Sequence, residues 1–174
     1  MKQLFKQFLL LAILSITVPA LGVQPPGDFA KSTISVGVVV ENLNKSLDFY
    51  QNVIGMVKTS EFSVESNRAK ELGLSNGDRF DVTILKLENS EQATEWKLMS
   101  FGRKATHPKQ TYVPDDTGMQ YVTIYVKSMQ PILERIKKYK VKTLGITPTK
   151  LDESRDFVLV QDPDGNFIEL ISSK

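Results

Sequence analysis

The same pattern of residues occurs twice in this chain, 86 positions apart, and this repeat limits the folds that the sequence can adopt. Apolar residues alternate with others at residues 36–40, which is typical of a strand, and recur at helical spacing over residues 43–54. Gly55 then favours a helix end, and Asn42 or Asn44 could cap the helix start. The second copy has the same alternation at residues 122–126 and a helical pattern from Met129 towards Lys140, with Ser128 as the expected cap.

Strand-like segments follow each predicted helix. They are residues 56–64, 79–87 and 95–101 in the first copy, and residues 142–147, 156–161 and 166–171 in the second. Each copy is therefore predicted to be a βαβββ module in an α+β domain. One helix cannot cover both faces of a four-stranded sheet, so two modules bury more surface together, and their concave sheet faces can enclose a cavity.

The repeat also predicts the organisation of the chain. We expect one domain over residues 32–174, with module one at about 32–103, a linker at about 104–117 and module two at about 118–174. Whether the modules pair within one chain or between two chains is left open.

The N-terminal residues have the pattern of a secretory signal peptide. Lys2 and Lys6 precede an apolar run at residues 8–18, and small residues at 20–22 suit a cleavage site. The run is shorter than the roughly 20 apolar residues of a membrane-spanning helix, so an uncleaved anchor is the alternative. We expect a signal peptide at residues 1–22, a flexible leader at 23–31, and a periplasmic or secreted protein.

Composition excludes several classes of partner and site. Cleavage after residue 22 would remove two of the 22 basic residues and none of the 20 acidic ones, leaving a net charge near zero. A near-neutral chain without a basic run argues against nucleic acid or an anionic membrane surface as partner. The absence of cysteine excludes disulfides, thiolate metal sites and lipidation at cysteine.

Four stretches carry a resemblance to a known family. They are "VGVVVENLNKSLDFYQNVIGM", "ELGLSNGDRFDVTILKLE", "DDTGMQYVTIYV" and "DPDGNFIEL". Together they resemble the vicinal oxygen chelate superfamily, which includes glyoxalase I, methylmalonyl-CoA epimerase, extradiol dioxygenases and bleomycin-resistance proteins. The resemblance covers nearly all of the mature chain and implies the two-module fold. It does not choose an activity, because this fold serves isomerases, lyases, dioxygenases and binding proteins.

The resemblance also implies four positions that hold a divalent ion in metal-dependent members, usually with His, Gln or Glu. Here they are Ser35, Lys97, Tyr121 and Glu169, of which Glu169 alone matches the family pattern. Zinc, iron and manganese prefer imidazole or carboxylate ligands, whereas a lysine ammonium is itself a cation. The sequence therefore predicts no metal or other cofactor, with a divalent ion (Zn, Mn, Fe or Ni) as the alternative.

We expect an ion pair between Lys97 and Glu169 in the place of the metal. The Lys97 ammonium would occupy the place of the metal's charge and neutralise Glu169, while Tyr121 and Ser35 would offer hydrogen bonds around the pair. The alternative is that Lys97 is a surface residue displaced by a register error. The single histidine, His107, is an expected loop residue that could reach over the cavity.

The sequence thus predicts an exported binding protein for a small organic molecule, with Ser35, Lys97, Tyr121 and Glu169 in its cavity and a degenerate metal site. The first alternative is a glyoxalase-type lyase, epimerase or dioxygenase, with or without metal, in which Glu169 is the catalytic base. The second is a scaffold that dimerises or binds another protein. A homodimer is compatible with each of these three hypotheses.

Overall fold

A computed structural model describes residue 27 and residues 29–104 and 108–173 of the chain. The chain divides into two units, Met1–Ala30 and Lys31–Lys174, and the second contains every helix and strand reported below. The expected signal peptide, most of the expected leader and His107 lie outside the described residues. Within the described part, none of the helices is both long and apolar enough to cross a membrane.

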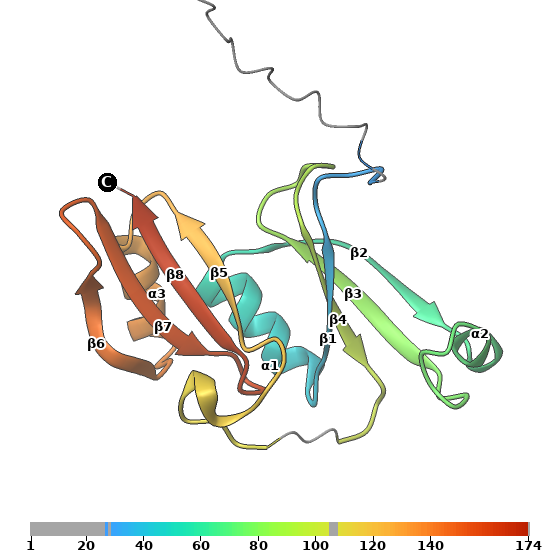
Figure 1. The fold of residues 1–174 in the computed structure, drawn as a ribbon. Helices are drawn as coiled ribbons and strands as arrows, with labels where there is room; N and C mark the ends of the chain where they lie inside the picture. The colour runs from blue at the N-terminus through green and yellow to red at the C-terminus, as the bar shows by residue number, and fades with distance from the viewer. Residues whose placement is uncertain (1–26, 28, 105–107, 174) are drawn as a thin grey trace, which may run out of the picture. The chain divides into compact units, whose positions relative to one another are not determined.

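Each copy of the repeat forms its own four-stranded sheet (Figure 1). The first copy contains β1 (Ser35–Val39), α1 (Leu43–Asp48), the π-helical segment η1 (Phe49–Ile54), β2 (Val57–Val64), α2 (Ser66–Glu71), β3 (Phe80–Lys86) and β4 (Glu95–Ser100). The second contains, after the 3₁₀ turn η2 (Val113–Asp115), β5 (Tyr121–Val126), α3 (Gln130–Lys138), β6 (Thr143–Lys150), β7 (Arg155–Gln161) and β8 (Phe167–Ser173).

The two sheets have the same topology. Their strand orders are β1-β4-β3-β2 and β5-β8-β7-β6; the β1–β4 and β5–β8 pairs are parallel and the other pairs are antiparallel. The predicted α+β fold of two βαβββ modules is confirmed, and α2 is an addition that the sequence pattern did not reveal.

Helical residues of η1 and α3 cover one face of each sheet. On the other face of the first sheet, a smaller apolar cluster buries Ala69 of α2 with Phe80, Val82 and Ile84 of β3, next to the part that carries Lys97. In Figure 1, α3 lies behind β7 and β8. One apolar cluster joins η1, β4, α3 and β8, with Tyr50, Leu98 and Leu170 fully buried in it and Ile136 5% exposed. The two modules of this chain therefore share a core. We call the opposite faces, which carry Ser35 and Lys97 in one sheet and Tyr121 and Glu169 in the other, the open faces.

The first helix begins and ends where its residue types predict. Asn42 Oδ1 accepts a hydrogen bond from the Lys45 amide at 3.1 Å, and Gly55 ends η1 with a φ of 97°. The expected cap at Ser128 is wrong, because Met129 precedes α3 and no side chain caps it. Pro131 lies in the first turn of α3 and has no amide hydrogen, so fewer donors need a cap there.

Replacing Asn42 with alanine is expected to lower the free energy of unfolding by about 1 kcal/mol, because the first turn of α1 loses its side-chain acceptor. Chemical denaturation measures the change. Asn44→Ala is the matched control: Asn44 lies exposed inside α1, where alanine is the better helix former. Equal losses in the two variants would contradict the role of Asn42.

The turn before β8 joins the two modules. The hydroxyl of Tyr50, in η1, donates to Asp162 Oδ2 at 2.7 Å. Ser46 Oγ and the Glu41 amide donate to the two carboxylate oxygens of Asp164 at 3.1 and 2.9 Å. Burial, followed by the charge of Asp162, raises the pKa of Tyr50 well above its usual value, so the phenol remains a donor. The acids of the "DPDG" stretch therefore hold the first module's helix.

A second contact between the modules comes from α3. Arg135 donates from Nε to the Val53 carbonyl at 2.7 Å and from Nη2 to the Ile54 carbonyl at 3.2 Å. These carbonyls lie at the end of η1, where backbone acceptors lack helical partners and a cation is favourable.

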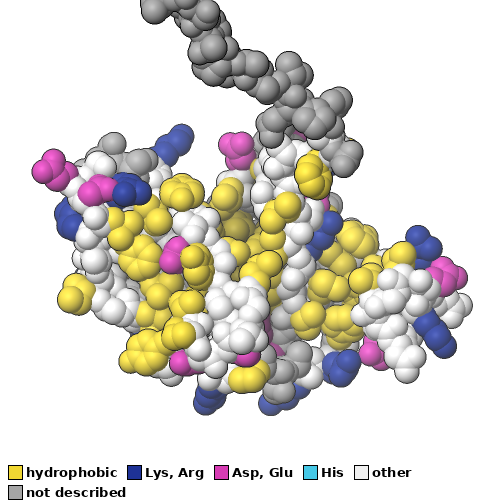
Figure 2. All heavy atoms as spheres, in the orientation of Figure 1, with side chains coloured by type: hydrophobic (Ala, Val, Ile, Leu, Met, Phe, Trp, Pro, Cys, Tyr) yellow, Lys and Arg dark blue, Asp and Glu magenta, His cyan; other side chains and the backbone are white. Residues whose placement is uncertain are grey.

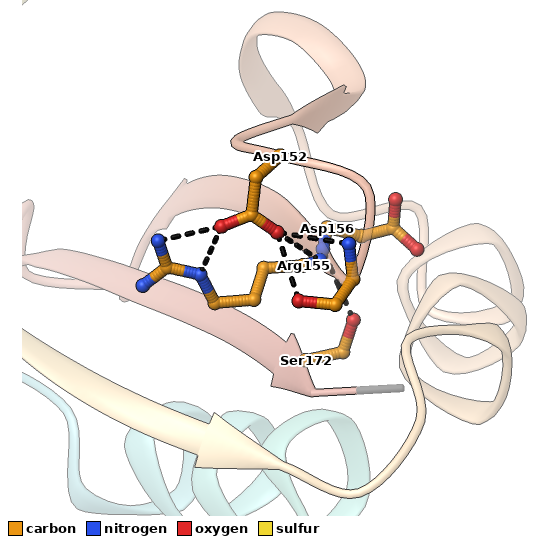
Figure 3. A network of polar contacts seen from close by, with 5 residues as sticks. Asp152, Arg155, Asp156 and Ser172 are labelled. Atoms are coloured by element: carbon orange, nitrogen blue, oxygen red, sulfur yellow. Dashed lines mark hydrogen bonds and ion pairs between the residues drawn. The ribbon is translucent and has the colours of Figure 1, made fainter.

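The β6–β7 turn carries a polar network that is shown in Figure 3. Asp152 accepts hydrogen bonds from Ser154 and from the backbone and side chain of Arg155. These donors, led by the Ser154 amide, hold the pKa of Asp152 well below its usual value. All three residues are exposed and belong to one turn, so the network fixes the hairpin.

Candidate functional site

The four predicted site residues occupy equivalent places in the two sheets. Ser35 begins β1 and Tyr121 begins β5. Lys97 is paired across the strands with Gly37, and Glu169 is paired with Thr123, two residues into the respective first strands. The repeat therefore extends to the registers of the sheets, and Lys97 and Glu169 are structural counterparts on the open faces.

In the first sheet the polar groups are paired locally. Ser35 Oγ donates to Glu95 Oε2 at 2.8 Å, and Lys97 Nζ lies 3.1 Å from the same oxygen. The hydrogen bond from Ser35, and after it the one from Lys97, hold the pKa of Glu95 below its usual value. Glu95 is a site residue that the sequence reasoning missed, although strand alternation places it on the face of Lys97.

The expected ion pair between Lys97 and Glu169 is wrong. Lys97 pairs with Glu95, two residues away on the same strand face, so its ammonium finds an acid without crossing between the sheets. Glu169 accepts a hydrogen bond from Thr123 Oγ1 at 2.7 Å instead. Among residues 29–104 and 108–173, no lysine or arginine forms an ion pair with Glu169.

Glu169 lies in an apolar part of the second open face. Its side chain is half-buried, and Leu159 of β7 is its partner on the side away from Thr123. Ile168 and Leu170, its chain neighbours, point to the other face and are fully buried. The prediction that strand alternation separates Glu169 from these two residues is confirmed.

A groove of about 440 Å³ runs between β1 and β5. Ser35 and Tyr121 contribute to its lining, whereas Lys97 and Glu169 lie outside it. Most of its wall is apolar or backbone, including Val39, Val122 and Phe167. The structure thus brings two of the four predicted residues to one groove and places the other two beside it, on the open faces of the flanking strands.

A divalent ion needs several carboxylate or imidazole ligands close together. Over the described parts of the chain, no three His, Cys, Asp or Glu residues are grouped so that they could hold a metal ion.

Replacing Ser35 with alanine is expected to raise the pKa of Glu95, because the carboxylate loses the hydrogen bond that contributes most to its lowered value. A carboxyl with a lowered folded-state pKa stabilises the fold above its unfolded-state pKa, and this stabilisation is lost as the pH falls through the folded-state value. As the pH is lowered, the Ser35→Ala variant should therefore begin to lose this stabilisation at a higher pH than the unchanged protein. NMR titration of the Glu95 carboxyl measures the shift. Ser60→Ala, on the exposed β2, should leave it unchanged.

The fold and the paired open faces define a two-module α+β protein, and the comparisons with known proteins identify the family. Residues 33–170 match the Glyoxalase/Bleomycin resistance protein/Dioxygenase superfamily. The chain belongs to this superfamily, which confirms the resemblance of its four sequence stretches.

Relatives and solved structures agree with the assignment. A lactoylglutathione lyase of Neisseria meningitidis serogroup A is 27% identical over 135 residues, which are 78% of this chain and 86% of that protein. A glyoxalase family protein from Bacillus cereus has a similar fold, with a TM-score of 0.69 at 16% identity over 86% of this chain and 98% of that one. The glyoxalase I of Leishmania major has a TM-score of 0.56 at 20% identity over 82% of this chain and 87% of that one.

Proposed function

We propose that this protein is exported and binds a small organic molecule in the groove between β1 and β5, without a metal ion. The observation that carries the proposal is the groove itself, because an apolar wall with a few polar groups is the usual form of a small-molecule site. Ser35 and Tyr121, two of the family's ligand positions, contribute to its lining.

The donor set does not fit the divalent ion that the family implies. Lys97 offers a positive charge, and the hydroxyls of Ser35 and Tyr121 are poor ligands for zinc, iron or manganese. Glu95 adds a second carboxylate, but the Lys97 ammonium lies 3.1 Å from one of its oxygens and would repel a cation. Glu169 then remains as a single carboxylate ligand, which is too few to hold a divalent ion.

Metal content is the first experiment for this proposal. The mature protein, purified without chelator and exposed to Zn²⁺, Mn²⁺, Fe²⁺ or Ni²⁺, should hold less than stoichiometric metal and show no rise in melting temperature. A specific ligand raises stability by about 2.7 kcal/mol at a hundredfold excess over its Kd. Stoichiometric metal that is lost in a Glu169→Ala variant would overturn the proposal.

That outcome would favour the enzymatic alternative. In it, Glu169 removes a proton beside a carbonyl, and Lys97 or Tyr121 polarises the carbonyl oxygen. The half-buried carboxylate of Glu169 supports this alternative, as does the name of the neisserial relative, a lactoylglutathione lyase. Turnover of a hemithioacetal that disappears in Glu169→Gln would establish it.

Export has its own test. We expect the protein to accumulate outside the cytoplasm with an N-terminus at Val23, as N-terminal sequencing of the fractionated protein would report. Leu11→Arg puts a charge into the apolar run and should hold the full-length chain in the cytoplasm. As the control, Lys31→Arg, outside the signal, should leave export unchanged. Cytoplasmic protein that retains Met1 would contradict export.

A further inference from the structure

The carboxylate on the first open face has a cationic partner, whereas the carboxylate on the second has a neutral one. In the first sheet, Glu95 and Lys97 form an ion pair at 3.1 Å, so the acid and the base neutralise each other. In the second sheet, the hydroxyl of Thr123 is the hydrogen-bond donor to Glu169, and it brings no charge. Among the residues that the structure describes, the Glu169 carboxylate thus has no cationic partner, and the second open face carries a net negative charge at this point.

Apolar and aromatic side chains surround Glu169 on its face. The strand registers give two polar neighbours, Thr123 and Gln161. They also give six apolar or aromatic ones on β5, β7 and β8: Tyr121, Tyr125, Phe157, Leu159, Phe167 and Ile171. Figure 2 shows hydrophobic side chains gathered over these strands. Tyr121 and Tyr125 are 47% and 75% exposed, which is high for aromatic residues on a sheet face. They flank Thr123 on β5 and lie diagonal to Glu169, within reach of an aromatic side chain.

We propose that Glu169, Tyr121 and Tyr125 form a binding site for an organic cation, a tertiary or quaternary ammonium group carried on an apolar body. This inference rests on the proposed function, because it names the class of ligand whose charged end would lie beside the same groove. Tyr121 lines the groove and is also a diagonal neighbour of Glu169, so one residue is common to the groove and the cation site.

The chemistry of the site favours this class over others. A carboxylate supplies the counter-charge, and tyrosine rings attract a cation held over their faces. An alkylated ammonium is mostly apolar surface, so it fits a wall of leucine, isoleucine and phenylalanine. An anionic ligand would meet the Glu169 charge, while the cation that could attract it, Lys97, is already paired with Glu95. A divalent ion would find a single carboxylate there.

Three probes that share a benzyl group test the inference. They are benzyltrimethylammonium, benzyl alcohol and phenylacetate, each titrated into the mature protein and followed by backbone NMR shifts. We expect the cation to bind at least about tenfold more tightly than phenylacetate, with shifts at Thr123 and Tyr121, and to weaken as salt is added.

Three variants distinguish the contribution of the Glu169 charge to affinity from the contribution of the apolar surface. Glu169→Gln keeps the shape and removes the charge, and should weaken the cation about tenfold while benzyl alcohol binds as before. Tyr125→Leu removes an exposed ring but keeps apolar surface, and should weaken the cation several-fold; this variant retains the test if Glu169→Gln fails to fold. Glu134→Gln, on the exposed face of α3, is the control for general charge effects and should change neither affinity.

The outcomes distinguish the two proposals. Benzyl alcohol that binds in the groove as tightly as the cation, or a cation affinity that Glu169→Gln leaves unchanged, would overturn the inference and leave the binding function intact. Shifts from none of the three probes would overturn both. A preference for phenylacetate would also overturn the inference and would assign the site to anions.

Discussion

Replacing Asp162 with alanine is expected to lower the free energy of unfolding by about 3 kcal/mol. Asp162 is 5% exposed, and its carboxylate accepts four hydrogen bonds. They come from the Tyr50 hydroxyl at 2.7 Å, from the Asn166 amide and side chain at 2.8 and 2.9 Å, and from the Asp164 amide at 3.0 Å. Without this acceptor, the fully buried Tyr50 hydroxyl would have to remain unpaired or draw water into the core.

A double-mutant cycle isolates the contact between the modules. Tyr50→Phe removes the donor but leaves Asp162 its other three partners, so we expect a smaller loss, of about 1.5 kcal/mol. The double variant should cost less than the sum of the two single ones, by about 1 kcal/mol or more, because both remove the same hydrogen bond. Urea denaturation supplies all four free energies.

Asp164→Ala is the matched control in the same turn. Asp164 is only half-buried and bonds to Ser46 and to the Glu41 amide, so its loss should cost about 1 kcal/mol. A cost equal to that of Asp162→Ala, together with no coupling between Tyr50 and Asp162, would show that the buried hydrogen bond does not join the modules.

The strands next to the shared core could be predicted from the sequence because one face of each packs against the buried apolar cluster. Alternation in the last strand separates Ile168 and Leu170, which are fully buried, from Glu169, which is not. The observed β8, Phe167–Ser173, lies within two residues of the predicted segment at both ends. The repeat added a second constraint, because a strand assignment in one module also had to fit the corresponding residues of the other module, 86 positions away.

Elements without such a pattern were missed. Ala69 is the buried residue of α2, so this short helix shows no apolar periodicity. The predicted helix after Asn42 is α-helical only as far as Asp48 and then becomes η1. Apolar residues at Tyr50 and Ile54 suit either kind of helical turn, so their spacing could not distinguish them.

At the site, positions were predictable and partners were not. Family spacing placed Lys97 and Glu169 at equivalent registers, as the structure has them. Their partners, Glu95 and Thr123, depend on the side-chain conformations, which the strand pattern does not specify. The long side chain of Lys97 forms its ion pair with an acid on its own strand, and Glu169 accepts a hydrogen bond from the neighbouring strand. The acids of "DPDG" are of a type that is common in turns. Their second role, accepting hydrogen bonds from Tyr50 and Ser46, requires the other module to be in place.

Replacing Leu170 with alanine is expected to lower the free energy of unfolding by about 3 kcal/mol, because the side chain is fully buried in the shared core and its removal leaves a cavity. Leu159→Ala is the matched control: Leu159 is half-buried on the open face, beside Glu169, and the same deletion there should cost about 1 kcal/mol. Thermal and urea denaturation of both variants measure the difference.

The comparison of these two leucines also tests the placement of Glu169. The side-chain period of a strand is two, so a slip of one residue in β8 would move Leu170 to the open face and Glu169 into the core. Equal costs for the two variants, or a larger cost for Leu159→Ala, would reverse the assignment of faces. The carboxylate would then face the helices instead of the tyrosines of β5, and an organic cation on the open face could not reach it.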